Sequence, residues 1–294
     1  MATLSQWVEG ARPRTLPAAV APVLVGTGAA YALGEGEAGL ALLALLVSLA
    51  LQVGVNYAND YSDGIRGTDT DRVGPVRLVG QGLARAGDVK LAAMLAFFVA
   101  ALFGLALVSL SAAWLMLPVG AASIAAAWYY TGGKRPYGYS GLGEVFVFVF
   151  FGLVATLGTT YTQALSVSPE AIAGAVGIGA IASAILVANN LRDIPTDQEH
   201  GKRTLAVRLG DGRTRALYAG LLATALVCVL VAGLIHPAAL LGLLSFVLAI
   251  PLLRRVLGGA LGADLVPVLS GTGRFELVYG TLLAIGLTLS PHLG

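Results

Sequence analysis

Apolar segments of about 20 residues, the length that a helix needs to cross the hydrocarbon core of a bilayer, recur along the whole sequence. Only 12% of the 294 residues are charged, whereas soluble domains carry roughly a quarter. We therefore expect one all-α, polytopic membrane domain, residues 1–294, with about nine transmembrane helices around a central cavity. The expected spans are 15–33, 39–59, 90–109, 112–130, 142–163, 170–190, 214–234, 237–256 and 273–291.

The basic residues all lie on one side of this arrangement. Every one of the 18 lysines and arginines precedes the first expected span or follows an even-numbered one. Because short cytoplasmic loops retain basic residues, we expect the N-terminus in the cytoplasm, the C-terminus outside and a multi-pass protein of the cell membrane. Topology thus accounts for the positive charge, and a nucleic-acid partner is not indicated. Further spans follow the first one, which argues against a cleaved signal peptide.

Two polar segments at the ends of even-numbered spans resemble each other. The first contains Asn56, Asn59, Asp60 and Asp63 and continues to Asp69 and Asp71, while the second contains Asn189, Asn190, Asp193 and Asp197. Their leading aspartates lie four expected spans apart, as a parallel repeat of four helices would place them. We therefore expect an internal repeat, approximately 1–140 and 141–294, with the two acidic segments facing each other across a shared cavity.

The spacing of these aspartates suits a metal ion. Pairs three or four residues apart share one face of a helix end. Mg²⁺ takes one or two carboxylates together with substrate phosphate oxygens, and nearby cations can bind the remaining phosphate charge. The alternative, that these are solvated charges that set topology, suits a single basic residue better than two acidic clusters at membrane ends. The candidate phosphate-binding cations are Arg72, Arg77, Lys134, Arg192, Lys202 and Arg203.

A third segment on the expected cytoplasmic side, residues 129–144, combines aromatic residues, glycines and two cations. Tyr130, Tyr137 and Tyr139 could cover an aromatic substrate, although an interfacial aromatic belt would explain the tyrosines equally well. Glu144 stands at the start of a span, where a carboxylate is costly unless it is paired or functional. We expect Cys228 to be a buried apolar residue, and His200 to be a loop residue rather than a metal ligand.

The polar segments resemble the motifs of the UbiA superfamily of intramembrane prenyltransferases, and the similarity covers nearly the whole chain. Asn59, Asp60 and Asp63 match the start of its NDxxDxxxD motif, whose last aspartate is replaced here by Gly67, with Asp69 and Asp71 just beyond. Asp193 and Asp197 match its DxxxD motif. Residues 132–152 look like the branch of this superfamily that prenylates 1,4-dihydroxy-2-naphthoate in menaquinone biosynthesis.

The resemblance implies a fold, a reaction and a set of site residues. Aspartate-bound Mg²⁺ would hold a polyprenyl diphosphate, and the naphthoate ring would attack the allylic cation and lose CO₂ to give demethylmenaquinone. The active site would face the cytoplasm, the bilayer would hold the isoprenoid tail, and no obligate protein partner is evident. The implied catalytic residues are Asn59, Asp60, Asp63, Asp193, Asp197 and Lys134. The implied metal ligands are Asp60, Asp63, Asp193, Asp197 and Asp69 or Asp71, and the implied substrate-binding residues are Asn56, Arg72, Arg77, Tyr130, Tyr137, Tyr139, Glu144, Asn190, Lys202 and Arg203.

Two other functions fit parts of the sequence. A related prenyltransferase could use the same site with a hydroxybenzoate, homogentisate, tetrapyrrole or lipid acceptor. A cation-coupled transporter could also have internal repeats and acidic residues at broken helices. The position of the carboxylates favours the enzyme, because they lie at one side with phosphate-binding cations rather than near the middle of the spans.

Overall fold

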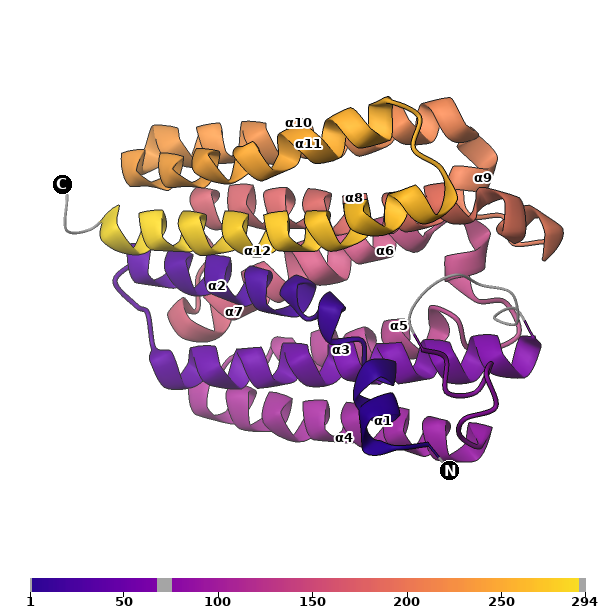
Figure 1. Cartoon of the computed structure of the whole chain (residues 1–294). Coiled ribbons are helices and arrows are strands. Elements are labelled where there is room, and N and C mark those ends of the chain that lie inside the picture. Colours follow the sequence, from indigo (N-terminus) through magenta and orange to yellow (C-terminus); the bar gives the residue numbers. More distant parts are fainter. Residues whose placement is uncertain (1, 68–75, 291–294) are drawn as a thin grey trace.

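The computed structural model describes residues 2–67 and 76–290, and every regular element in them is a helix. The long helices run side by side along one axis (Figure 1). In chain order the elements are α1 (Leu4–Gly10), η1 (Pro13–Thr15), α2 (Pro17–Ala32), α3 (Ala38–Arg66), α4 (Ala86–Ser111), α5 (Met116–Tyr129), η2 (Tyr137–Ser140), α6 (Gly143–Val147), η3 (Phe148–Val154), α7 (Ala155–Ala164), α8 (Pro169–Glu199), α9 (Leu205–Leu209), α10 (Asp211–Ile235), η4 (Pro237–Ser245), α11 (Phe246–Leu257), η5 (Gly262–Leu265) and α12 (Val266–Leu289).

Each expected span coincides with a helical rod, but not every rod is a clear membrane span. Within the described residues, six rods are long and apolar enough to cross a bilayer: α3, α4, α6 to α7, α8, α10 and η4 to α11. A seventh is added if Leu4–Thr15 and α2, which meet at a bend of 47°, form one span. The expectation of nine spans is therefore not confirmed. One reason is that α5 has 14 residues, about 21 Å of helix, against a hydrocarbon core of about 30 Å.

Helix α8 is the central element of the bundle. Most of its apolar stretch is buried, and it packs against α2, α10, α12 and the π-helical segment η3. Glycines allow these close approaches, since a Cβ on Gly152 of η3 would lie 2.4 Å from Cα of Gly179 on α8. Small residues of this kind bring helix backbones together in membrane proteins. Cys228 is buried on α10, as expected from its place in an apolar run.

The two helices that carry the acidic segments start and end in similar ways. At one end of the bundle, Glu37 caps α3 by accepting the N–H groups of Gly39 and Leu40, and Ser168 caps α8 by accepting the N–H group of Ala171. The helices have 29 and 31 residues, about 44 and 46 Å, which exceeds the hydrocarbon thickness. Their last turns therefore extend beyond the apolar region.

This extension corrects the expected span ends but agrees with the expected position of the aspartates on helix ends. The expected spans ended at residues 59 and 190, whereas the helices continue to Arg66 and Glu199. In the structure, Asp60 and Asp63 lie in the last two turns of α3, and Asp193 and Asp197 lie in the last turns of α8. Gly67, in the left-handed region with φ 71°, ends α3. The carboxylates are thus held on rigid helix ends.

Candidate functional site

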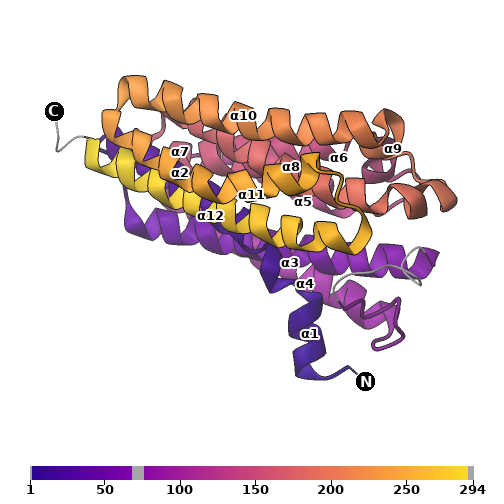
Figure 2. The same cartoon turned by 45° about the horizontal axis from the view of Figure 1, so that its top comes forward.

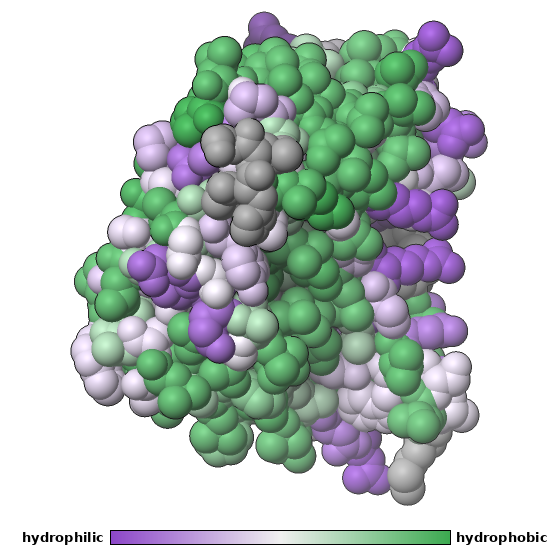
Figure 3. Space-filling model, turned by 90° about the vertical axis from the view of Figure 1, so that its left-hand side faces the viewer, coloured by the Kyte–Doolittle hydropathy of each residue, from purple (hydrophilic) through white to green (hydrophobic). Residues whose placement is uncertain are grey.

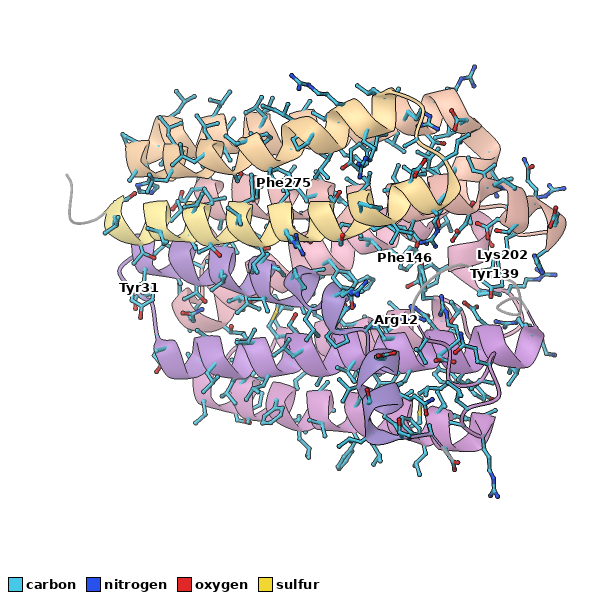
Figure 4. All side chains as sticks on the ribbon, viewed as in Figure 1. Arg12, Tyr31, Tyr139, Phe146, Lys202 and Phe275 are labelled. Carbon is cyan, nitrogen blue, oxygen red and sulfur yellow. The ribbon has the colours of Figure 1, made fainter. Side chains whose placement is uncertain are left out.

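Tyr139, on η2, contacts the first polar segment and also Lys202, which stands five residues after Asp197 of the second segment. Its hydroxyl group donates a hydrogen bond to a carboxylate oxygen of Asp63 on α3. The ammonium nitrogen of Lys202, which follows α8, lies 4.5 Å from the centre of its ring, and the guanidinium carbon of Arg66 lies 5.5 Å from the same centre. Figure 4 shows Tyr139 and Lys202 together near one end of the bundle. We call Asp63, Arg66, Tyr139 and Lys202 the Tyr139 cluster.

Backbone and side-chain hydrogen bonds fix residues 130–141 between the two polar segments. On the α3 side, Arg66 donates to the carbonyl groups of Thr131 and Gly133, and the Thr131 hydroxyl donates to Oδ1 of Asn59 at 2.8 Å. On the α8 side, the N–H of Arg203 donates to the carbonyl of Tyr139 at 3.0 Å. The aromatic segment therefore joins the two halves of the chain.

In the first acidic pair, Asp60 and Asp63 have different surroundings. Asp60 is fully buried, and its two oxygens accept the N–H groups of Leu78 and Val79 at 2.8 and 3.0 Å. Asp63 is also buried and holds Tyr139. Asp60 therefore anchors residues 78–79. Each of its oxygens keeps a further lone pair that can bind a metal ion. Three other expected site residues, Asp69, Asp71 and Arg72, lie outside the described residues.

In the second acidic pair, both carboxylates are buried and polar groups surround them. Arg192 forms an ion pair with Asp193 at 2.6 Å and donates to Oδ1 of Asn189 at 2.9 Å. The Thr204 hydroxyl lies 3.5 Å from Oδ2 of Asp197. The guanidinium group of Arg192 thus neutralises a neighbouring carboxylate, and its expected contact with phosphate stays a prediction.

The acidic pairs fit Mg²⁺ that is completed by phosphate, rather than an all-protein metal cage. Across residues 2–67 and 76–290, no three His, Cys, Asp or Glu side chains come close enough to hold an ion by themselves. Mg²⁺ keeps a near-octahedral shell of oxygens and commonly takes one or two of them from carboxylates and others from substrate phosphates. Each buried aspartate pair can supply that share. Lys202 and Arg66, which lie over the ring of Tyr139, are cations available for the phosphate charge.

A cavity of about 510 Å³ begins below the cluster. Asn56, Asn59, Tyr130 and Tyr137 line its polar end, and the rest of its wall is mainly apolar. The Asn56 amide is buried and donates to the carbonyl of Ala11 and the hydroxyl of Thr15 at 2.9 and 3.0 Å, so it holds the chain start against α3. A ligand could thus place a charged head group at the polar end, near the Tyr139 cluster, and an apolar tail along the apolar wall.

Aromatic rings form one wall of the polar end of this cavity. Tyr130 and Tyr137 pack edge to face at 5.5 Å, Tyr137 stacks on Phe146 at 3.9 Å, and Phe146 stacks on Phe150 at 6.0 Å. The Tyr137 hydroxyl donates to the carbonyl of Ala126 at 2.7 Å, and burial raises the pKa of this phenol. Tyr137 therefore stays protonated and presents its ring, not its oxygen, as a binding surface.

The other expected residues fall into two groups. Glu144 and Asn190 meet, since the Asn190 amide donates to Oε1 of Glu144 at 2.9 Å. Oε2 of Glu144 is buried and has no hydrogen-bond partner among the described residues. Arg77 is buried, and Lys134 and Arg203 are exposed. Lys134 takes no part in the contacts of the Tyr139 cluster described above.

The sequence interpretation missed two residues of the site. Arg66 was assigned to topology alone, although it stands three residues after Asp63 and so shares its helix face. Thr131 had no recognisable signal, because its bond to Asn59 joins residues 72 positions apart.

Comparisons with known proteins agree with this geometry. The model of the UbiA prenyltransferase family matches residues 19–260. The 1,4-dihydroxy-2-naphthoate octaprenyltransferase of Mycobacterium tuberculosis is 58% identical over 97% of this chain and 97% of the relative, and the Escherichia coli protein of the same name is 41% identical over 97% and 95%. The structure of a UbiA homologue from Archaeoglobus fulgidus bound to GPP and Mg²⁺ aligns with a TM-score of 0.62 at 13% identity, over 96% of this chain and 99% of that chain.

The anchoring contacts of Asp60 predict that Asp60→Asn lowers stability without any ligand. An asparagine leaves one backbone N–H facing an amide NH₂ group, which costs about 1–3 kcal/mol for a buried donor. We expect a lower midpoint of thermal unfolding in nanodiscs that contain EDTA. Asp63→Asn is the matched control, because its amide oxygen can still accept from Tyr139. An unchanged midpoint for Asp60→Asn would mean that Asp60 does not anchor residues 78–79.

Proposed function

The chain belongs to the UbiA prenyltransferase family, and we propose that it transfers a polyprenyl group from polyprenyl diphosphate to 1,4-dihydroxy-2-naphthoate, with loss of diphosphate and CO₂. The immediate product is the reduced, quinol form of demethylmenaquinone, and the reaction is a step of menaquinone biosynthesis. The observation that carries this proposal is identity of 39–58% over 95% or more of both chains to four proteins named 1,4-dihydroxy-2-naphthoate octaprenyltransferase. The family makes the chain an enzyme, not the transporter considered as an alternative.

The proposed donor suits both ends of the cavity. Its diphosphate would lie at the polar end, close to Lys202, Arg66 and the two acidic pairs, and its isoprenoid tail would lie along the apolar wall. Mg²⁺, when bound, would neutralise charge on the departing diphosphate. We assign its binding to Asp63, Asp193 and Asp197, with Asp60 as both ligand and anchor. Asp69, Asp71, Arg72, Arg77, Lys134 and Arg203 remain proposed contributors on the same side.

The protein supplies position and charge rather than a nucleophile. The bond between C1 of the donor and its diphosphate oxygen breaks, and the pair of electrons leaves with the diphosphate beside fixed cations. The electron-rich naphthoate ring attacks the allylic cation, and the bond to its carboxylate breaks to release CO₂ and return electrons to the ring. Tyr130, Tyr137 and Phe146 wall this end of the cavity with rings, which limits the water that could trap the cation.

Glu144 and Asn190 are proposed to contact the acceptor. They come from different helices, α6 and α8, and meet by a hydrogen bond of 2.9 Å. Tyr130 is close to them, since a Cβ added to Gly143, the residue before Glu144, would lie 3.6 Å from the Tyr130 ring. Oε2 of Glu144, which has no partner in the part of the chain that the structure describes, is a buried acceptor for a hydroxyl group of the naphthoate.

The membrane arrangement is also part of the proposal. We assign nine spans, an internal repeat of residues 1–140 and 141–294, a cytoplasmic N-terminus, an outside C-terminus and a site facing the cytoplasm, in the cell membrane. The nine rods and the one-sided basic residues support it. At the opposite end of the bundle, hydrophobic side chains cover much of the surface (Figure 3), including Leu110, Leu165 and Leu234.

The reaction predicts that product formation depends on the buried aspartates and on Mg²⁺. Purified protein in nanodiscs is incubated with Mg²⁺, 1,4-dihydroxy-2-naphthoate and a polyprenyl diphosphate, and prenylated product is measured by mass spectrometry. We expect Asp63→Asn and Asp197→Asn to lower kcat at least roughly 100-fold, as loss of one electrostatic group in a catalytic site does, and EDTA to abolish turnover.

The matched control for this assay is Asp88→Asn, because Asp88 is an exposed carboxylate in the first turn of α4 and does not belong to the Tyr139 cluster. It should keep wild-type activity. If 4-hydroxybenzoate or homogentisate is prenylated and the naphthoate is not, the result would agree with the family mechanism but contradict the assigned acceptor. Absence of product with every acceptor would contradict the proposed function.

The proposed topology predicts one-sided labelling of engineered cysteines. Cys228→Ser removes the single native thiol, and Lys134→Cys or Ser166→Cys then places an exposed thiol at opposite ends of the bundle. We expect a membrane-impermeant maleimide to label residue 134 from the cytoplasmic side and residue 166 from the outer side of oriented vesicles. Labelling of both positions from the same side would contradict the nine-span arrangement.

A further inference from the structure

Three glycines line the apolar part of the cavity without being required for helix packing. Gly104 on α4, Gly120 on α5 and Gly158 on α7 all face it. A Cβ at residue 120 would have nothing within 4 Å, one at residue 104 would have Val47 at 4.0 Å, and one at residue 158 would have Met116 at 3.7 Å. By contrast, a Cβ on Gly152 or Gly26 would lie within 2.4 Å of backbone atoms of a neighbouring helix. The three cavity glycines therefore keep space open.

Their distance from the head end can be counted along the helices. Gly120 lies ten residues before Tyr130, and Gly158 lies twelve residues after Phe146, which correspond to about 15 and 18 Å of helix. An extended isoprenoid unit adds four carbon–carbon bonds, roughly 5 Å along the chain. Gly120 and Gly158 therefore lie at the depth that the third and fourth isoprenoid units of a bound donor would reach, and Gly104 lines the same cavity from α4.

Helix α5 is a thin wall at this level. None of its residues from Met116 to Tyr129 is buried, and its main packing partners are α3 and α4. Nine of its residues line the cavity, while others, such as Tyr129, are exposed. A side chain added at position 104, 120 or 158 would project into the cavity between α4, α5 and α7.

We propose that Gly104, Gly120 and Gly158 set the length of isoprenoid chain that the enzyme accepts, by leaving a passage at the depth of the third and fourth units. This inference rests on the proposed function. Donors that end above the glycines do not need the passage, whereas longer donors must pass between these three positions before their distal units reach the lipid beside α5. The three glycines are thus specificity-determining positions for the donor.

The test compares donors of different length in the same protein. Wild type, Gly104→Leu, Gly120→Leu and Gly158→Leu, each in nanodiscs with Mg²⁺ and 1,4-dihydroxy-2-naphthoate, receive an equimolar mixture of geranyl, geranylgeranyl and octaprenyl diphosphates. Products are separated by mass, which gives the ratio of kcat/KM for the octaprenyl and geranyl donors. We expect this ratio to fall at least roughly tenfold in the leucine variants, as steric discrimination in apolar pockets does, and to fall less in the matching alanine variants.

Gly220→Leu is the matched control. Gly220 lies on α10, a Cβ there would also have nothing within 4 Å, and it does not line the cavity. It should leave the ratio unchanged. Two results would overturn the inference: an unchanged ratio in all three cavity variants, or an equal fall in kcat/KM for every donor in variants that remain monodisperse by size exclusion. In either case, product from the wild type would still support the proposed function. Absence of product from wild type with any donor would instead contradict the proposed function itself.

Discussion

The hydrogen bond from the Tyr139 hydroxyl to Asp63 links parts of the chain that lie far apart in the sequence. Lys202 and Arg66 lie against the same ring, and Arg203 holds the backbone of Tyr139 from the α8 side. Buried charges are costly unless they are paired, so this one aromatic residue lets acidic and basic groups from both halves share a small volume. The candidate site depends on these contacts, since each half of the chain alone supplies only one of the two carboxylate pairs.

The length of α3 and α8 places the candidate site at the membrane surface. Because α3 and α8 are longer than the hydrocarbon core, their last turns carry carboxylates on regular backbone rather than on loops. Helix α3 continues as one wall of the apolar cavity. Helix α8 continues into the core of the bundle, where it packs against α2, α10 and α12 (Figure 2). A charged head and an apolar tail of one substrate can therefore be held by the same rigid elements, which suits chemistry that depends on positioning.

Much of this could be predicted from the sequence. Apolar runs located every rod, and the spacing of Asp60, Asp63, Asp193 and Asp197 located both acidic pairs, because these are local patterns. The family and its reaction followed from the same motifs. The shortness of α5, the anchoring of residues 78–79 by Asp60 and the bond from Thr131 to Asn59 could not be predicted, because they depend on contacts between distant segments or on where a helix ends.

Binding of Mn²⁺ in place of Mg²⁺ tests most directly whether the two acidic segments form one metal–diphosphate site. Free and bound Mn²⁺ are counted by electron paramagnetic resonance on protein in nanodiscs, with and without inorganic pyrophosphate. The account predicts tight binding only when pyrophosphate is present, and its loss in both Asp63→Asn and Asp197→Asn. Tight binding without pyrophosphate, or binding that one of these two changes leaves intact, would contradict a shared site.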